Sequence, residues 1–158
     1  MNGVASYFAS VSGAVNLVPK VAEDKPKITF RETFSGKSHF AHELDLGGRF
    51  GKNKEWGIRA NIGMEDGTTR FRNEKYEEKN IFVNFDYRGE NTSAQLLLGR
   101  RSVNHKGSQT GIRMNKQSLP LPPKGDANFQ PPWGEYGHAN DIITFSLEHR
   151  SLDRKSVV

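Results

Sequence analysis

Apolar and polar residues alternate in several stretches of this 158-residue chain, and the clearest example lies between residues 80 and 101. An alternation with a period of two predicts a β-strand whose two faces meet different surroundings. Two such arms flank the polar residues 88–92, so the stretch predicts a hairpin. Phe82 is the exception, an apolar residue on the polar side of the first arm. The apolar sides consist of Ile81, Val83, Phe85 and Tyr87 in the first arm and Ala94, Leu96 and Leu98 in the second.

The same pattern predicts four more strands, which gives six in all. Short turns are expected at 35–38, 51–55 and 88–92, and longer loops at 65–79 and 102–141. Tight turns at one end and long loops at the other are typical of an outer-membrane β-barrel. The first turn departs from this rule, and a soluble β-sandwich stays open as the alternative. The six strands are expected at 27–34, 40–50, 56–62, 80–87, 94–101 and 142–149.

Composition agrees with sheets that have one wet side. Only 34% of the residues are hydrophobic, and no run approaches the 18 apolar residues of a membrane helix. The net charge is +5, but Lys and Arg are interleaved with Asp and Glu, as in residues 75–79. This mixing argues against a nucleic-acid surface. The first 20 residues lack a basic region before their apolar stretch, so an export signal is expected further upstream.

Candidate chemistry is sparse. The chain has no cysteine, and His39 and His42 are three residues apart, so a strand projects them to opposite faces. The residues Gly36-Lys37-Ser38 match the end of a phosphate-binding loop, but Arg31 stands where its first glycine is required. Neither a metal site of the protein nor an enzyme is expected from these patterns.

Four segments, in order, resemble TonB-dependent siderophore receptors. The sequence from Gly13 to Lys20, GAVNLVPK, resembles the last strand of the plug domain of these receptors, and Asn2-Gly3 resembles a preceding plug segment. The sequence from Glu43 to Gly51, ELDLGGRFG, resembles the second strand and first periplasmic turn of the barrel. The proline-rich sequence from Leu119 to Trp133 resembles the third extracellular loop.

This resemblance implies a fold and a domain division. The fold would be all-β, an antiparallel up-and-down meander of about six strands from a transmembrane β-barrel of about 22 strands. Residues 1–22 would be the C-terminal end of the plug domain, and residues 27–154 the N-terminal part of the barrel. The chain would then be a fragment, because six strands leave two edges unpaired in lipid.

The resemblance also implies a function. The whole receptor would sit in the bacterial outer membrane, in contact with its lipid, and take up a ferric siderophore. Energy would come from the TonB–ExbB–ExbD complex through the missing N-terminal part. Iron would arrive already chelated, so no cofactor is expected, and nucleic acid is not an expected partner. The alternative function is a soluble, carbohydrate-type ligand-binding module that uses the loop around Trp133.

Ligand-binding candidates lie in the last long loop and beside it. Trp133 and Tyr136 could stack on a ligand, but for Trp133 the favoured interpretation is a residue of the aromatic girdle at the membrane interface. The stretch 109–113 lacks the aromatic residues with which ferrichrome-type receptors contact their ligand, which argues against ferrichrome. Solvated loop residues are the competing interpretation. The candidates are His105, Gln109, Arg113, Trp133 and Tyr136.

Arginines recur on the polar faces of the expected strands. In a barrel they would line the lumen, where they would contact plug carboxylates or create a positive field for anionic chelates. In a barrel, Val83→Arg should cost about 2 to 4 kcal/mol at mid-bilayer, whereas Asn84→Arg on the opposite face should cost little. The arginines concerned are Arg31, Arg49, Arg59 and Arg101.

Overall fold

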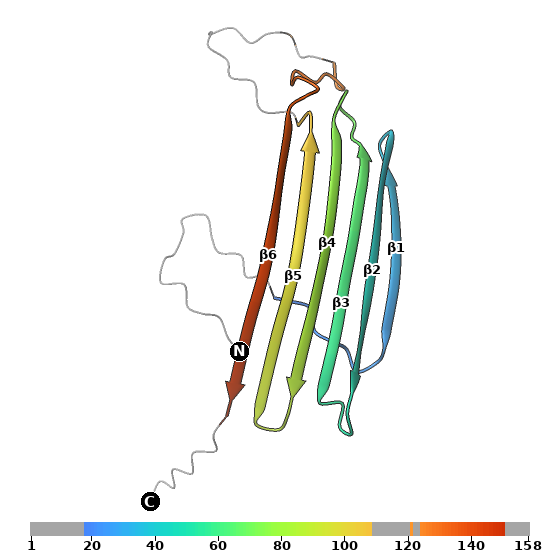
Figure 1. The fold of residues 1–158 in the computed structure, drawn as a ribbon. Helices are drawn as coiled ribbons and strands as arrows, with labels where there is room; N and C mark the ends of the chain where they lie inside the picture. Colours follow the sequence, from blue (N-terminus) through green and yellow to red (C-terminus); the bar gives the residue numbers. More distant parts are fainter. Residues whose placement is uncertain (1–17, 109–120, 122–123, 151–158) are drawn as a thin grey trace, which may run out of the picture.

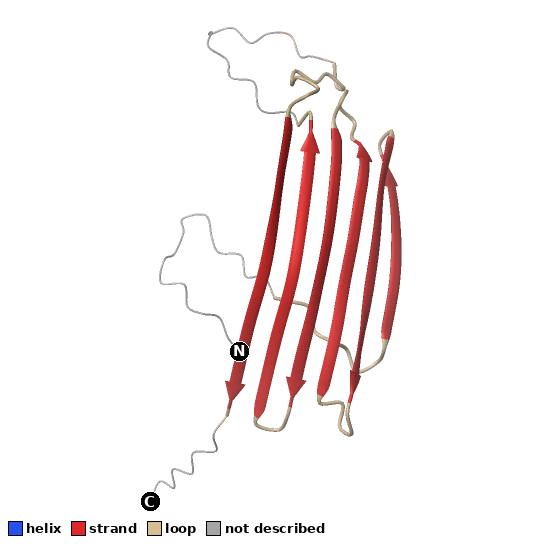
Figure 2. Ribbon diagram, viewed as in Figure 1, coloured by secondary structure: helices blue, strands red, loops and turns tan. Residues whose placement is uncertain are grey.

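The computed structural model describes residues 18–108, 121 and 124–150, and these residues form one curved antiparallel sheet (Figures 1 and 2). Each strand pairs with the next one along the chain, in the order β1-β2-β3-β4-β5-β6. The predicted all-β up-and-down meander of six strands is therefore confirmed. The strands are β1 (Lys27–Ser35), β2 (Ser38–Phe50), β3 (Trp56–Thr68), β4 (Lys75–Arg88), β5 (Thr92–Lys106) and β6 (Glu135–His149).

Several strands are longer than the sequence pattern predicts. β3 continues to Thr68 and β4 already begins at Lys75, so the expected loop at 65–79 is wrong. The expected loop at 102–141 is also too long, because β5 reaches Lys106 and β6 begins at Glu135. In these extensions the side that was apolar carries residues such as Lys79 and Ser102. A strand that is polar on both faces has no hydrophobic period, so the pattern could not reveal it.

The two faces of the sheet have different chemistry, and neither packs against a second sheet. We call the side that carries Val83 and Leu98 the apolar face, and the opposite side the polar face; cross-strand partners share a face. Among the described residues only Ala22 and Val103 are buried hydrophobic side chains. The described part also contains no helix long and apolar enough to span a membrane. A β-sandwich needs a dry core between two sheets, so the alternative fold is wrong.

The large apolar residues of the apolar face form a belt, and the edge of this belt runs obliquely across the strands. Counted from the end with the turns at 51–55 and 88–92, the last large apolar side chain on β6 is Ile143, which lies in the row of Val83, whereas on β2 it is Phe40, in the row of Glu77. The difference between these rows is six residues along β4, or about 20 Å, while β2 and β6 lie about 19 Å apart. The strands are therefore inclined by about 45° to the belt edge. Strands of transmembrane barrels have a similar tilt.

Aromatic pairs mark the lower and upper limits of the belt. Trp56 and Tyr87 are cross-strand partners at the end with the short turns, and their ring centroids lie 4.7 Å apart. Phe34 and Phe40 are partners near the other end, with centroids 4.9 Å apart. Aromatic residues at the borders of an apolar belt are typical of membrane barrels.

Gly67 provides a test of strand packing. Its φ is +149°, and an added Cβ would overlap the main-chain carbonyl of Ser38 on the neighbouring strand. We expect Gly67→Ala to destabilise the full-length protein by about 1 to 3 kcal/mol, since neither backbone can yield easily. Urea-induced unfolding in lipid vesicles measures this difference. Gly125→Ala is the matched control, because no atom lies within 4 Å of its added Cβ; equal midpoints for the two variants would contradict the expected clash.

Candidate functional site

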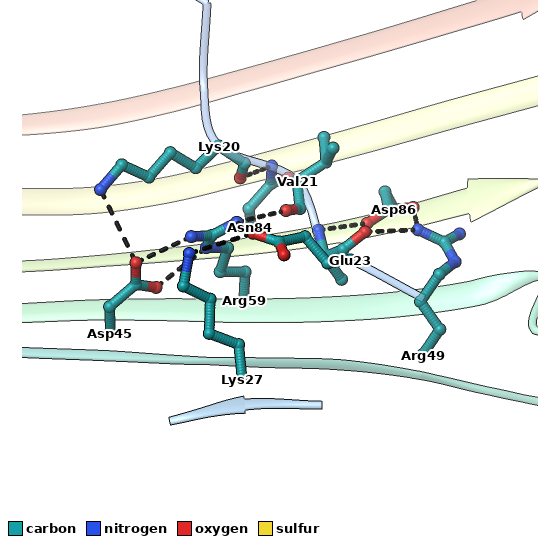
Figure 3. Close-up of polar contacts among 10 residues, drawn as sticks. Lys20, Val21, Glu23, Lys27, Asp45, Arg49, Arg59, Asn84 and Asp86 are labelled. Carbon is teal, nitrogen blue, oxygen red and sulfur yellow. Dashed lines mark hydrogen bonds and ion pairs between the residues drawn. The ribbon is translucent and has the colours of Figure 1, made fainter. Parts of the chain in front are cut away.

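The segment before β1 crosses the polar face of the sheet (Figures 1 and 3). We call residues 18–26 the strap. Asn84 Nδ2 of β4 donates a hydrogen bond to the carbonyl oxygen of Lys20 at 2.7 Å. Arg59 of β3 donates to the carbonyl oxygen of Val21 at 2.8 Å, and Arg49 of β2 donates to that of Ala22 at 3.2 Å. Three neighbouring strands therefore bind three consecutive carbonyl groups of the strap.

Arg59 is the centre of this contact. Its guanidinium makes a two-point pair with Asp45 of β2, with N–O distances of 2.9 and 2.7 Å. The same group donates to Glu23 of the strap at 3.2 Å, and Lys20 lies 3.7 Å from Asp45. Only 7% of the Arg59 side chain is exposed. A buried guanidinium needs this number of acceptors, because its charge and five N–H groups have lost their water.

Arg49 forms a second buried pair next to the first. Its Nη1 lies 2.5 Å from Asp86 Oδ2, and the Arg49 side chain is 1% exposed. Two carbonyl oxygens of the β2–β3 turn, those of Lys54 and Glu55, accept further hydrogen bonds from Arg49 at 2.7 and 3.0 Å. Asp86 also accepts a hydrogen bond of 3.4 Å from the main-chain nitrogen of Ala22. The pair thus ties together the strap, the turn and β4.

The strap ends in weaker, exposed contacts. Arg88 pairs with the carboxylate of Asp24, and Lys54 donates to the main-chain oxygen of Asp24 at 3.1 Å. The hydrogen bond from Arg88 lowers the pKa of Asp24, and a hydrogen bond from Lys27 lowers the pKa of Glu23. Both carboxylates are therefore ionised, and both lie next to the cations that they neutralise.

All four arginines that the sequence placed on the polar face lie there, and each is paired with a carboxylate. Arg31 contacts Glu43 at 2.9 Å, and Arg101 makes two contacts with Glu78 at 2.8 and 2.7 Å. Arg59 also contacts Glu23, which lies just after the predicted end of the plug, so the expected contact with a plug carboxylate stays a prediction. These four arginines therefore do not create an unpaired positive field. The sequence pattern could not show this, because the carboxylate partners lie on other strands.

Three of the five predicted ligand-binding residues are described, and they lie at the end of the sheet that carries the long connection. His105 and Tyr136 are cross-strand partners on the polar face, and Tyr136 is 64% exposed. His105 Nε2 lies 3.0 Å from Glu74, and its ring meets that of Tyr76 edge-on at 5.3 Å. Trp133, in the connection before β6, is 80% exposed. Gln109 and Arg113 lie outside the described residues.

Trp133 lies far from the belt in sequence. Trp133 comes ten positions before Ile143, the uppermost large apolar residue of the belt on β6, and β6 begins only at Glu135. The eight residue steps of β6 from Glu135 to Ile143 already span about 26 Å, so Trp133 lies well beyond the edge of the belt. This position favours a loop residue over a girdle residue.

Sequence reasoning missed a polar cluster beneath these residues. Tyr76 donates to Glu78 at 2.5 Å, and the Tyr76 ring stacks at 6.0 Å on His39. His39 in turn contacts Glu65 of β3 at 2.5 Å. Tyr76, Glu78 and Glu65 fell in the expected loop at 65–79, and His39 was considered only together with His42. No sequence pattern therefore pointed to this cluster. Within the described residues, no three His, Cys, Asp or Glu side chains are grouped so that they could hold a metal ion.

One face of the sheet carries an exposed apolar belt, and the other carries ion pairs and holds the strap. These two features place the chain in the class of membrane β-barrels, as a part of the barrel wall. No family model matches the sequence. The ferrichrome receptor FcuA of Yersinia enterocolitica is 26% identical over 84% of this chain, which spans 18% of that receptor. The crystal structure of BauA, the ferric preacinetobactin receptor of Acinetobacter baumannii, is 27% identical with a TM-score of 0.79. That match covers 82% of this chain and 20% of BauA.

FpvA of Pseudomonas aeruginosa, solved with a bound pyoverdine, has the same fold, with a TM-score of 0.74 at 14% identity. That match covers 85% of this chain and 18% of FpvA. Over most of its length, the chain is homologous to TonB-dependent siderophore receptors, as its sequence motifs predicted. These homologues are outer-membrane transport receptors and not enzymes, which agrees with the predicted location and with the absence of an enzyme motif. The chain spans about a fifth of the length of these relatives.

Proposed function

We propose that this chain belongs to a longer outer-membrane receptor that takes up a ferric siderophore. The chain would contribute a part of the barrel wall and the end of the plug, and it would not transport anything by itself. The observation that carries this proposal is the pairing of an exposed apolar belt with a polar face that holds the preceding segment. A wall between lipid and a wet, plugged lumen needs both features.

The domain division follows the same logic. We assign residues 1–22 to the C-terminal end of the plug and residues 27–154 to the start of the barrel. Supporting this division, β1 begins at Lys27, directly after the strap has crossed β4, β3 and β2. The TonB–ExbB–ExbD complex would act through a part of the receptor upstream of this chain, and lipid would cover the apolar face.

The class of siderophore is a separate question. The relatives are receptors for ferrichrome and ferric preacinetobactin, which differ in chemistry, so neither name assigns a ligand to this chain. The test is binding of a panel of ferric hydroxamates, ferric catecholates and mixed chelates to the full-length protein. We expect saturable binding of at least one chelate, and uptake that stops when the inner-membrane energy supply is removed. If no chelate in the panel binds, the proposed function is overturned.

Trp133 and Tyr136 give a prediction for the ligand contact. We expect Trp133→Ala and Tyr136→Ala each to weaken binding of the accepted chelate about tenfold, because an aromatic face that stacks on a ligand contributes about 1.4 kcal/mol or more. Titration of the purified full-length protein measures the change. Leu121→Ala is the matched control, since Leu121 is 92% exposed in the same connection. Unchanged affinity in both aromatic variants would show that Trp133 and Tyr136 are solvated residues without a ligand contact.

A further inference from the structure

The strap makes some contacts through its side chains, but at three consecutive residues it is held through its main chain. Lys20, Val21 and Ala22 are consecutive, and the carbonyl oxygen of each accepts a hydrogen bond from a different strand of the sheet (Figure 3). The donors belong to β4, β3 and β2 in turn, so the strap runs across the strands. Contacts of this kind fix the path of the backbone.

The three donors are buried, and carboxylates of the wall orient two of them. Asn84 is 2% exposed, Arg59 is 6% exposed and the Arg49 side chain is 1% exposed. Asp45 and Asp86, which belong to the wall, orient the two guanidinium groups. If the strap left, three donors would lose an acceptor at the same time, and each lost hydrogen bond would have to be replaced.

The hold begins abruptly. Val18 is 77% exposed, whereas two residues later the carbonyl of Lys20 is bound, and Ala22 is 4% exposed. Pro19 lies between Val18 and the first bound carbonyl group. Within the described residues, the hold of the sheet on the strap therefore begins at Lys20.

We propose that the strap is a permanent anchor, which stays bound to β2, β3 and β4 when the segment before it is displaced. The role of this anchor in uptake rests on the proposed function, but the anchoring itself does not. The three contacts come from three different strands, and all of them lie before Lys27, where β1 begins. A pull applied directly at Lys27 would break the hydrogen bonds of β1 one at a time. With the anchor in place, a force on the preceding segment acts first at Lys20, Val21 and Ala22, and β4, β3 and β2 share it.

The experiment measures when the strap becomes accessible. The chain has no cysteine, so single cysteines can be placed at Ala22 and, as an exposed reference, at Val18. The full-length protein in lipid vesicles is exposed to increasing urea and to short pulses of a water-soluble maleimide, while circular dichroism follows the sheet. We expect Val18→Cys to react without urea, and Ala22→Cys to react only where the sheet signal is lost. Reaction of Ala22→Cys while the sheet is intact would overturn the proposal.

Two variants in the Ala22→Cys background identify the donors that hold the strap. Asn84→Leu and Arg59→Lys should each increase the labelling rate in the folded state severalfold, and either one suffices if the other does not fold. Arg31→Lys is the matched control, because Arg31 contacts Glu43 and not the strap. An unchanged labelling rate in both donor variants would also overturn the proposal. Because the assay uses no siderophore, it succeeds or fails independently of binding and uptake.

Discussion

Replacing Arg59 with methionine is expected to destabilise the full-length protein by about 3 to 5 kcal/mol, the usual cost of removing one partner from a buried ion pair. The substitution keeps most of the volume but leaves Asp45, which is 17% exposed, without its two-point partner. It also removes the donor for the carbonyl oxygen of Val21 and the contact with Glu23. Urea-induced unfolding in lipid vesicles, followed by circular dichroism, measures the loss.

Arg31→Met is the matched control for this prediction. Arg31 also pairs with a carboxylate on β2, but its side chain is 65% exposed and that of Glu43 is 56% exposed. An exposed pair contributes only about 0 to 1 kcal/mol, so this variant should unfold close to the parent. Adding Asp45→Leu to Arg59→Met should recover part of the stability, because no unpaired buried charge then remains. Equal losses for the two arginine variants would show that burial does not set the strength of these pairs.

The second large effect is expected on the apolar face. Val83 lies in the middle of the belt on β4, with Ala60 and Leu98 as its cross-strand partners. Val83→Arg should destabilise the full-length protein in lipid by about 2 to 4 kcal/mol, since the guanidinium would face hydrocarbon at mid-bilayer. The same measurement of unfolding in vesicles tests this value.

Thr144→Arg is the control on the opposite face. Thr144 is exposed on the polar face of β6, where a charge would meet water, so its cost should be small. Asn84, which the sequence offered for this purpose, is unsuitable. It is 2% exposed and binds the strap, so an arginine there would break a contact and overfill a buried site. Similar costs at Val83 and Thr144 would contradict the assignment of the two faces.

These two predictions concern the two boundaries of one wall. The belt holds the sheet in lipid because apolar side chains there need no partner. The polar face holds the strap because buried charges and amides there do need partners. In the proposed receptor, the first boundary would keep the wall in the membrane, and the second would join the wall to the plug.

The alternation of side chains alone was enough to predict the sheet. Runs such as the one from Ile81 to Tyr87 predicted strands, their faces and their order along the chain, because the period of a strand is fixed by backbone geometry. The short turns at 51–55 and 88–92 also followed from local residues. The motif around Lys20, together with three other segments, pointed to siderophore receptors, and the chain is similar to such receptors over most of its length.

Other features could be seen only in the folded sheet. The extensions of β3, β4, β5 and β6 were missed because outside the belt both faces are polar, and the hydrophobic signal ends where the apolar surroundings end. The pairing of Arg59 with Asp45, and of Arg49 with Asp86, depends on the register of neighbouring strands, and no local pattern encodes that register. The sequence by itself thus determined which side chains face lipid, since that depends on each strand alone. Only the tertiary structure decided which polar groups hold the strap, since that contact combines residues from three strands with a segment that precedes them all.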